Sequence, residues 1–331
     1  MKILFVGGYG NISWHCTQKA LELGHDVYLL NRSQTTTSRR ELPVGAKLIL
    51  SDIRDIEQTQ KALGKLDFDV VCDFICYHAQ EAEDAIKLFK NKTKQYIVVS
   101  SGANYNRIGA KYPLTEDVPQ FNNWIYAKNK IEMEQVFMAE YKASGFPVTI
   151  VRPGQTYDTL IPDAVGNADW TVAQRIIDGR PIIIFGDGTT LWTVTHSKDF
   201  ANAFVQLFAN PETIGEAYHI TSDEWLTWNE ITKLTAKALG VDSPKIIYMP
   251  TSFIEKINPE LAKGITGHKM HCDIYDNAKI KSIAKGWSAE IKFEEGIKQS
   301  IKWLYENPKR RRINQNLDNA IDELCEKYEQ N

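Results

Sequence analysis

The 331-residue sequence is short of cysteine, of long apolar runs and of net charge. Its five cysteines are scattered and odd in number, which argues against a disulfide framework and predicts a reduced, cytoplasmic protein. The apolar runs are no longer than strands, so no segment is expected to span a bilayer. A formal net charge of −3 gives no overall attraction to nucleic acid or to anionic membranes. We therefore expect a soluble globular protein, for which a membrane is not expected as a partner and nucleic acid is disfavoured.

Apolar runs of strand length alternate with helical patterns through the first half of the chain. The expected strands are residues 2–6, 26–30, 47–50, 69–75, 95–100 and 147–151, and the expected helices are residues 13–23, 56–64, 79–90 and 124–143. This alternation predicts an α/β fold with a doubly wound parallel sheet of the Rossmann type. Residues 1–155 would form this dinucleotide-binding domain, to which residues 190–225 are expected to return. Residues 156–189 and 226–331 would form a smaller, mostly helical substrate-binding domain.

A glycine-rich turn links the first expected strand to the first expected helix. It reads Gly-Gly-Tyr-Gly-Asn-Ile-Ser over residues 7–13. Such a turn lets the backbone approach a pyrophosphate, which then meets the free N–H groups and the positive end of the helix dipole. The residues expected to bind a dinucleotide here are Gly7, Tyr9, Gly10, Asn11 and Ile12.

The second expected strand ends at Asn31, Arg32 and Ser33, where this fold meets the adenosine ribose. No carboxylate stands here to accept a hydrogen bond from a ribose 2′-hydroxyl, whereas the guanidinium of Arg32 suits a 2′-phosphate. The sequence therefore favours NADP(H) as the cofactor, with NAD(H) as the alternative and a solvated loop arginine as the other interpretation of Arg32. Asp52 and Ile53 follow the third strand, where Asp52 could either contact adenine or cap the next helix.

Tyr126 and Lys130 lie four residues apart in an expected helix and so share one helical face. An ammonium beside a phenol favours the phenolate and would lower the pKa of Tyr126, which makes it an acid or base for alcohol–ketone interconversion. Such a pair alone is more often a surface pair. Ser101 changes this, because it follows an expected strand that delivers its hydroxyl to the same crevice, where it can orient a substrate oxygen. Together these residues predict a catalytic set of Ser101, Tyr126 and Lys130.

These motifs resemble the extended short-chain dehydrogenase/reductases, also called the NAD-dependent epimerase/dehydratase family, over nearly the whole chain. The matching residues are Gly7, Gly10 and Ser13 for the glycine motif, Asp52 and Ile53 for the adenine site, Ser101, Tyr126 and Lys130 for the catalytic set, and Arg152 and Pro153 for the segment that passes the nicotinamide. The resemblance implies hydride transfer in which Tyr126 moves a hydroxyl proton, Lys130 binds the ribose hydroxyls and Ser101 orients the substrate. It also places Phe74 and Pro153 beside the cofactor.

Two departures from the family pattern narrow the expected substrate. Dehydratases of the family carry an Asp-Glu pair directly after the serine position, whereas this chain has Gly102 and Ala103, so dehydration is disfavoured. Nucleotide-sugar members place an arginine where Trp192 stands, and an indole cannot neutralise a diphosphate but can stack on a sugar ring. Nucleotide-sugar activity is therefore also disfavoured. The candidate substrate residues are Tyr77, Gly102, Tyr105, Gln155 and Trp192.

The sequence thus predicts a nicotinamide-dependent oxidoreductase or epimerase that acts on a sugar-like or other hydroxyl or keto substrate, with the two reactions ranked equally. The alternative is a non-catalytic dinucleotide sensor or an RNA-associated member of the same fold. By analogy with the family, helices 79–90 and 124–143 are expected at a homodimer interface. No metal is expected, because His268 and His271 have no third ligand nearby in the sequence. Asp73 is a candidate second acid or base, although a helix cap or a lysine partner is the preferred interpretation.

Overall fold

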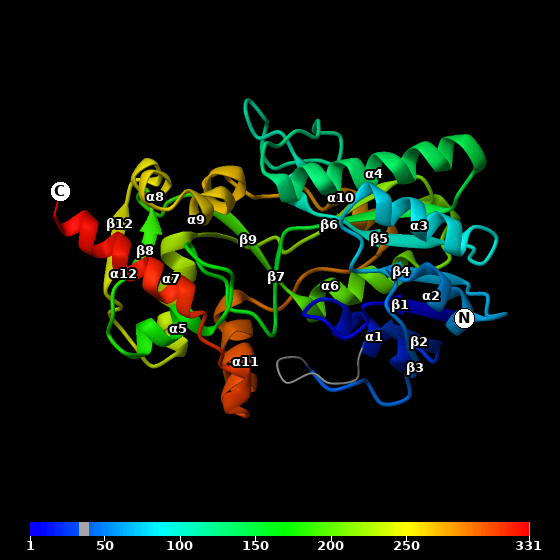
Figure 1. The fold of residues 1–331 in the computed structure, drawn as a ribbon, viewed down its shortest axis with the longest axis horizontal. Coiled ribbons are helices and arrows are strands. Elements are labelled where there is room, and N and C mark those ends of the chain that lie inside the picture. Colours follow the sequence, from blue (N-terminus) through cyan, green and yellow to red (C-terminus); the bar gives the residue numbers. More distant parts are fainter. Residues whose placement is uncertain (33–39, 331) are drawn as a thin grey trace.

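The computed structural model describes residues 1–32 and 40–330 of the chain. Within these residues, seven parallel strands form one sheet in the order β10-β6-β5-β4-β1-β2-β3 (Figure 1). The strands are β1 (Lys2–Val6), β2 (Asp26–Asn31), β3 (Lys47–Leu50), β4 (Val70–Asp73), β5 (Tyr96–Val99), β6 (Val148–Pro153) and β10 (Ala217–Ile220). The predicted Rossmann-type sheet is confirmed. Its strand order reverses between β1 and β4, which is where sheets of this kind bind a ligand.

Side chains alternate along the strands, so each face of the large sheet has its own apolar core. In β1, Ile3 and Phe5 pack toward one face, and Leu4 and Val6 pack toward the other. The first face is covered by α1 (Ser13–Glu22) and α6 (Ser197–Phe204), and the second by α2 (Ile56–Leu63), α3 (Ala79–Phe89) and α4 (Ile125–Ser144). Nearly continuous apolar strands are thus buried on both sides, as a doubly wound sheet requires.

The second half of the chain forms a separate core around two small sheets (Figure 1). A three-stranded sheet contains β7 (Gln155–Tyr157), β9 (Leu191–His196) and β11 (Trp225–Thr227), and a two-stranded sheet contains β8 (Ile182–Phe185) and β12 (Ile246–Met249). The helices of this region are α5 (Trp170–Ile177), α7 (Trp228–Ala238), α8 (Thr251–Ile257), α9 (Pro259–Gly264), α11 (Phe293–Tyr305) and α12 (Gln315–Glu329). Of the segment expected to return to the large sheet, β10 pairs with β6 there, whereas β9 joins the three-stranded sheet.

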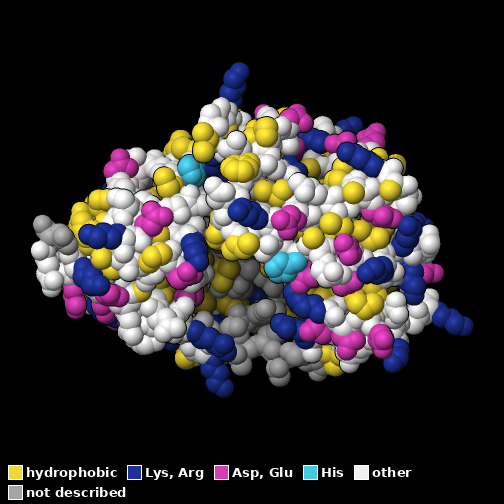
Figure 2. Space-filling model, turned by 45° about the horizontal axis from the view of Figure 1, so that its top comes forward, with side chains coloured by type: hydrophobic (Ala, Val, Ile, Leu, Met, Phe, Trp, Pro, Cys, Tyr) yellow, Lys and Arg dark blue, Asp and Glu magenta, His cyan; other side chains and the backbone are white. Residues whose placement is uncertain are grey.

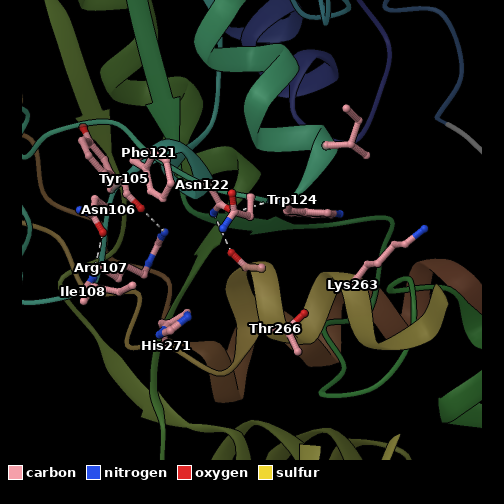
Figure 3. Close-up of a pocket in the computed structure, with 13 residues that line it drawn as sticks. Tyr105, Asn106, Arg107, Ile108, Phe121, Asn122, Trp124, Lys263, Thr266 and His271 are labelled. Atoms are coloured by element: carbon pink, nitrogen blue, oxygen red, sulfur yellow. Dashed lines mark hydrogen bonds between the residues drawn. The ribbon is translucent and has the colours of Figure 1, made fainter. Parts of the chain in front are cut away.

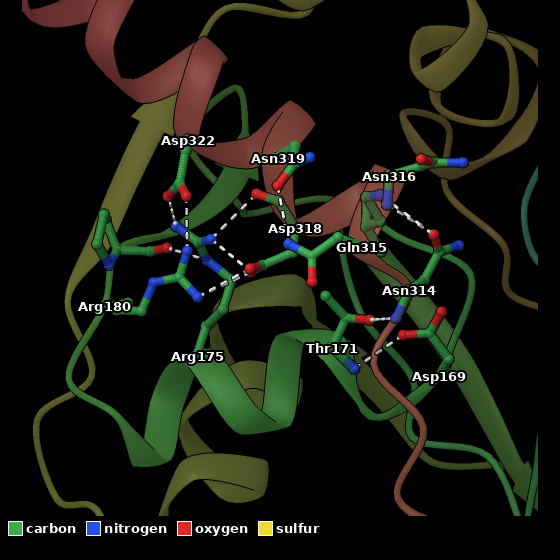
Figure 4. Close-up of polar contacts among 12 residues, drawn as sticks. Asp169, Thr171, Arg175, Arg180, Asn314, Gln315, Asn316, Asp318, Asn319 and Asp322 are labelled. Carbon is green, nitrogen blue, oxygen red and sulfur yellow. Dashed lines mark hydrogen bonds and ion pairs between the residues drawn. The ribbon is translucent and has the colours of Figure 1, made fainter.

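The C-terminal helix α12 is fastened to α5 by a compact ion-pair network (Figure 4). The buried guanidinium of Arg175 lies 2.7 Å from Asp318 and 2.7 Å from Asp322. Arg180 approaches the same two carboxylates at 2.9 and 2.6 Å. Two arginines therefore hold successive turns of α12 against the second core. None of the helices in residues 1–32 and 40–330 is long and apolar enough to cross a membrane.

Candidate active site

The glycine turn brings the backbone close to its neighbours at the switch point of the sheet. Gly7 has a φ of +76°, a left-handed conformation that other residues rarely adopt. A Cβ on Gly8 would lie only 2.4 Å from Leu29 Cδ2. The Ser13 hydroxyl donates to the Gly7 carbonyl at 2.6 Å and accepts from the Gly10 N–H at 2.8 Å. Serine at the third position of the motif therefore fixes the turn through hydrogen bonds.

Helix α1 begins directly after the glycine turn. Its N-cap residue, Ile12, has no side-chain capping bond, and the first turn carries no acidic residue. A pyrophosphate suits such an uncapped N-terminus. The Asn11 side chain binds Thr156 O and Thr159 N, at 3.3 and 3.0 Å, and Tyr9 is buried in the core. The side chains of Tyr9 and Asn11 are therefore engaged within the protein, and their contact with a dinucleotide stays a prediction.

The expected ribose site lies at the end of β2. Asn31 Oδ1 accepts from the Gly8 N–H at 3.3 Å and so braces the glycine turn. Arg32 is 69% exposed, and its guanidinium lies 3.9 Å from Asp52. Ser33 lies outside the described residues. Arg32 thus keeps an extended, solvent-facing side chain beside a carboxylate, which leaves its guanidinium accessible.

A cavity of about 250 Å³ opens beside Ile53 and Ile75, where the family resemblance places adenine. Its lining residues are Ile53, Arg54, Asp73, Ile75, Cys76, Gln80, Glu81, Asp84 and Ala85. Helix α2 is capped by Asp55, which accepts from Gln58 N at 3.0 Å. The capping interpretation of Asp52 is therefore wrong, because the residue that caps the helix stands three positions later.

Ser101 and Tyr126 meet at the carboxyl end of β5. The Ser101 hydroxyl accepts from Ala103 N at 3.1 Å and begins a short helical turn over residues 102–104. Burial and the neighbouring Tyr77 phenol raise the pKa of Tyr126 to about 12, while a hydrogen bond with Ser101 opposes this rise. The sequence predicted a lowered pKa for Tyr126, and the shift in the structure has the opposite sign.

The Lys130 ammonium, which was expected to lower this pKa, is turned toward the backbone. Its Nζ donates to Cys76 O at 2.7 Å and to Val99 O at 2.8 Å, at the ends of β4 and β5. It also lies 4.2 Å from the centre of the Tyr77 ring. Burial lowers the pKa of Lys130 to about 8, although nearby acidic groups oppose the shift. Lys130 is thus held within the expected site, next to Tyr77 rather than paired with Tyr126.

Glu134, one helical turn beyond Lys130, ties α4 to the loop that carries Ser101. Its carboxylate is buried and accepts from Asn104 at 2.9 Å and from Gln120 at 2.7 Å. Arg152, at the end of β6, donates to the same carboxylate at 2.6 and 3.1 Å. Glu134 was not predicted as a site residue, although its spacing of four residues from Lys130 places both on the same face of the helix.

A second buried pair holds the same loop from the opposite side. Arg107 donates to the carbonyls of Gly102 at 2.8 Å and Tyr105 at 3.3 Å, and it is paired with Asp273. Asp273 is fully buried and also accepts from His268 at 3.0 Å. No sequence signal marks this pair, because its members lie 166 positions apart. The chain segment after Ser101 is therefore fixed by ion pairs on both sides.

The expectation that Trp192 stacks on a substrate ring is wrong. Trp192 is fully buried, with its ring 5.0 Å from that of Trp228 and 4.7 Å from that of His268. Its strand, β9, lies in the core of the second half of the chain rather than at a cavity wall. The family motif predicted where Trp192 stands in the sequence, but it could not show which face of this short strand is exposed to solvent. Trp192 is a packing residue.

The other expected substrate residues occupy varied places. Tyr105 is buried, and its hydroxyl bonds to Arg152 and His219. Gly102 leaves no room for a side chain, because a Cβ there would lie 2.0 Å from the Tyr275 hydroxyl. Tyr77 is partly exposed, with its ring 6.3 Å from that of Tyr126. Gln155 is half-buried on β7.

Two expected cofactor residues and one candidate acid lie at the ends of β4 and β6, the two strands that flank β5. Phe74 packs against Phe204 at 5.3 Å between ring centres, and Pro153 is buried at the end of β6. Asp73 accepts from the N–H groups that follow it and from Tyr96 at 2.6 Å. Three donors satisfy this buried carboxylate, which supports the structural interpretation of Asp73 over an acid or base.

A cavity of about 450 Å³ lies next to this site, between the segment after Ser101 and the helical segment after α9 (Figure 3). Its lining residues are Tyr105, Asn106, Arg107, Ile108, Phe121, Asn122, Asn123, Trp124, Ile125, Lys263, Thr266, Gly267 and His271. Trp124 joins the cavity to the catalytic set, because its ring lies 4.8 Å from that of Tyr126.

The fold and the site define a dinucleotide-binding protein of the short-chain dehydrogenase type. The features that do so are the parallel sheet, the glycine turn before the uncapped helix α1, and the set of Ser101, Tyr126 and Lys130. Residues 3–221 match the NAD dependent epimerase/dehydratase family, and the chain belongs to this family. The family identified from the sequence motifs is thereby confirmed. Membership supports a nicotinamide-dependent enzyme.

Several curated relatives and solved structures are similar to the chain. It is 26% identical over 318 residues to the chloroplast stem-loop binding protein of 41 kDa b of Arabidopsis thaliana, which covers 90% of this chain and 78% of that protein. It is 29% identical over 278 residues to a UDP-glucose 4-epimerase of Lactobacillus helveticus, which covers 74% and 83%. The structure of a UDP-glucose 4-epimerase from Thermotoga maritima matches with a TM-score of 0.72 and 21% identity, over 92% of this chain and 99% of that one. This structural likeness shows the fold.

Proposed function

We propose that the protein is a reductase or epimerase that moves a hydride to or from a hydroxyl-bearing or keto-bearing small molecule. The observation that carries this proposal is the Ser101–Tyr126 contact beside the buried ammonium of Lys130. A bound nicotinamide supplies the hydride chemistry. Tyr126 transfers the proton of the substrate oxygen, and Ser101 orients that oxygen by a hydrogen bond. Lys130 contributes a buried ammonium to the same site, where the family resemblance assigns it to the ribose hydroxyls.

The residues of the turn fit a dinucleotide. Gly7 and Gly8 let Ile75 and Leu29 pack against the turn, where a Cβ would lie 2.6 and 2.4 Å from these side chains. The N-terminus of α1, which has no side-chain cap, would bind the pyrophosphate. Arg32, exposed beside Asp52, supports a preference for NADP(H). Titration of the intrinsic tryptophan fluorescence with NADPH and NADH tests this preference. We expect Arg32→Ala to weaken NADPH binding by about tenfold or more and to leave NADH binding unchanged, with the exposed Lys65→Ala as the control. Tighter binding of NADH by the wild type would contradict the preference.

The absence of an acid–base pair at Gly102 and Ala103 supports redox or epimerisation over dehydration. The catalytic proposal is tested by following NADPH oxidation with a panel of keto sugars and other ketones. Tyr126→Phe should lower kcat by at least about a hundredfold, whereas Tyr248→Phe, at an exposed tyrosine of the second region, should not. Unchanged turnover by Tyr126→Phe would refute the mechanism. Mass analysis of any nucleotide that co-purifies separates the two reactions, since epimerisation needs a retained cofactor.

A second candidate function, binding to structured RNA, is favoured by one observation, the similarity to the chloroplast stem-loop binding protein over 90% of the chain. The surface argues against it. Figure 2 shows acidic and basic side chains interspersed over the viewed face. In the run of residues 309–312, Arg310 lies over Trp303 at 4.1 Å and Arg311 over Tyr305 at 4.9 Å. Salt-dependent submicromolar binding of a stem-loop RNA in a gel-shift assay would favour this function over the enzymatic one.

A further inference from the structure

The cavity beside Trp124 has the position of a substrate subsite. Tyr126 would act on the reacting carbon, and the Trp124 indole, whose ring lies 4.8 Å from that of Tyr126, also forms part of the cavity wall. In Figure 3 the indole lies above the helical segment that carries Lys263 and Thr266. The part of a substrate that does not react would therefore extend from Tyr126 past Trp124 into about 450 Å³ of space.

The charges around this cavity are already balanced. Arg107 is its one buried cation among the described lining residues, and its charge is neutralised by the fully buried Asp273. Burial and the nearby Arg107 lower the pKa of His271 from 6.5, so its imidazole is neutral at pH 7. Lys263 lies at the rim with its side chain 54% exposed, and it is paired with Glu260. A diphosphate entering here would lose its hydration without meeting a free buried cation.

The remaining polar groups of the wall are neutral. They are the amides of Asn106, Asn122 and Asn123 and the hydroxyl of Thr266, interleaved with the apolar surfaces of Phe121 and Trp124. Asn122 is already oriented, because its amide donates to Ala103 O at 2.8 Å and to Gly267 O at 2.7 Å. Amides beside aromatic faces suit a polyhydroxylated ring, whose hydroxyls need hydrogen bonds and whose C–H face needs apolar contact.

We infer that this cavity binds an uncharged glycosyl or other polyol ring, so that the substrate is a neutral glycoside rather than a nucleoside diphosphate sugar. The inference rests on the proposed function, since it takes Tyr126 as the reacting end of the site. It assigns Trp124 the role of the apolar wall and Asn106 and Asn123 the role of hydroxyl partners. The Asn122 amide shapes the wall instead, because it is already bonded to Ala103 O, Gly267 O and Trp124 N. Specificity would thus come from the segment between Ser101 and Tyr126 rather than from Trp192.

Isothermal titration of the full-length protein, saturated with NADP⁺, tests the inference without any turnover. The probes are cellobiose, as a neutral disaccharide, and UDP, as a diphosphate. Cellobiose should bind and UDP should bind more weakly. Trp124→Ala should weaken cellobiose binding by about tenfold, and Trp225→Ala, at an exposed tryptophan of β11, should not.

Two outcomes would overturn the inference. One is the absence of cellobiose binding, or its persistence unchanged in Trp124→Ala. The other is UDP binding that exceeds cellobiose binding and is lost in Lys263→Ala, which would make the cavity an anion site. Tyr126→Phe separates this inference from the proposed function, because it should abolish hydride transfer while cellobiose still binds.

Discussion

Replacing Glu134 by glutamine tests whether the buried ion pair with Arg152 holds the catalytic loop. Both side chains are at most 9% exposed, and the carboxylate accepts from Arg152, Asn104 and Gln120. Glutamine keeps one acceptor oxygen but presents an NH₂ group to a donor, and it leaves the guanidinium without its counter-charge. Removing one partner of a buried pair typically costs about 3–5 kcal/mol. Arg152 keeps its bond to the Tyr105 hydroxyl at 2.8 Å, so we expect about 3 kcal/mol, the lower end of this range.

Urea unfolding measures this cost, and Glu132→Gln is the matched control on the exposed side of the same helix. The control should change the free energy of unfolding by no more than about 0.5 kcal/mol. The double variant Glu134→Gln with Arg152→Met should recover part of the loss, because the guanidinium no longer lies buried and unpaired. If Glu134→Gln unfolds within about 1 kcal/mol of the wild type, or if the double variant loses the full sum of both single changes, the reasoning fails.

Three further predictions follow from the described contacts. The pKa of Lys130 falls from 10.5 to about 8 on folding, so the unfolded chain binds more protons than the folded protein between these pH values. The free energy of unfolding of the wild type, relative to that of Lys130→Met, should therefore rise from about pH 8 to pH 10.5 in urea titrations. A difference that does not change with pH would contradict this prediction. Gly7→Ala should abolish NADPH binding measured by fluorescence, because Gly7 has a φ of +76° and the new Cβ would lie 2.6 Å from the Ile75 side chain. Retained binding would show that the turn is not the cofactor site. Arg175→Met should destabilise the docking of α12 by about 3 kcal/mol. Limited proteolysis should therefore cleave the C-terminal helix faster in this variant than in the control Glu326→Ala, at an exposed residue of the same helix. Equal cleavage rates would show that the ion pair with Asp318 does not hold the helix in place.

The first half of the chain could be predicted closely from the sequence, because apolar runs alternate there with helical patterns. The expected strand 47–50 and helix 13–23 agree with β3 and α1 to within one residue. The glycine turn and the position of Ser101 follow from the same local order of strand, turn and helix. By contrast, β7, β8, β11 and β12 were not foreseen, because they lie in the second half of the chain, where this alternation is lost.

What the sequence determined is the set of chemical groups and the local geometry that delivers them: a turn only glycine can make, a serine at a strand end, and a tyrosine and a lysine on one helical face. What the tertiary structure decided is the environment of each group. The Lys130 ammonium binds two strand-end carbonyls instead of the Tyr126 phenol, and Trp192 lies in a core instead of a cavity. Glu134 and Asp273 acquire their roles from partners brought together across the fold. Burial and long-range pairing set pKa values and orientation, and neither is contained in the spacing of residues along the chain.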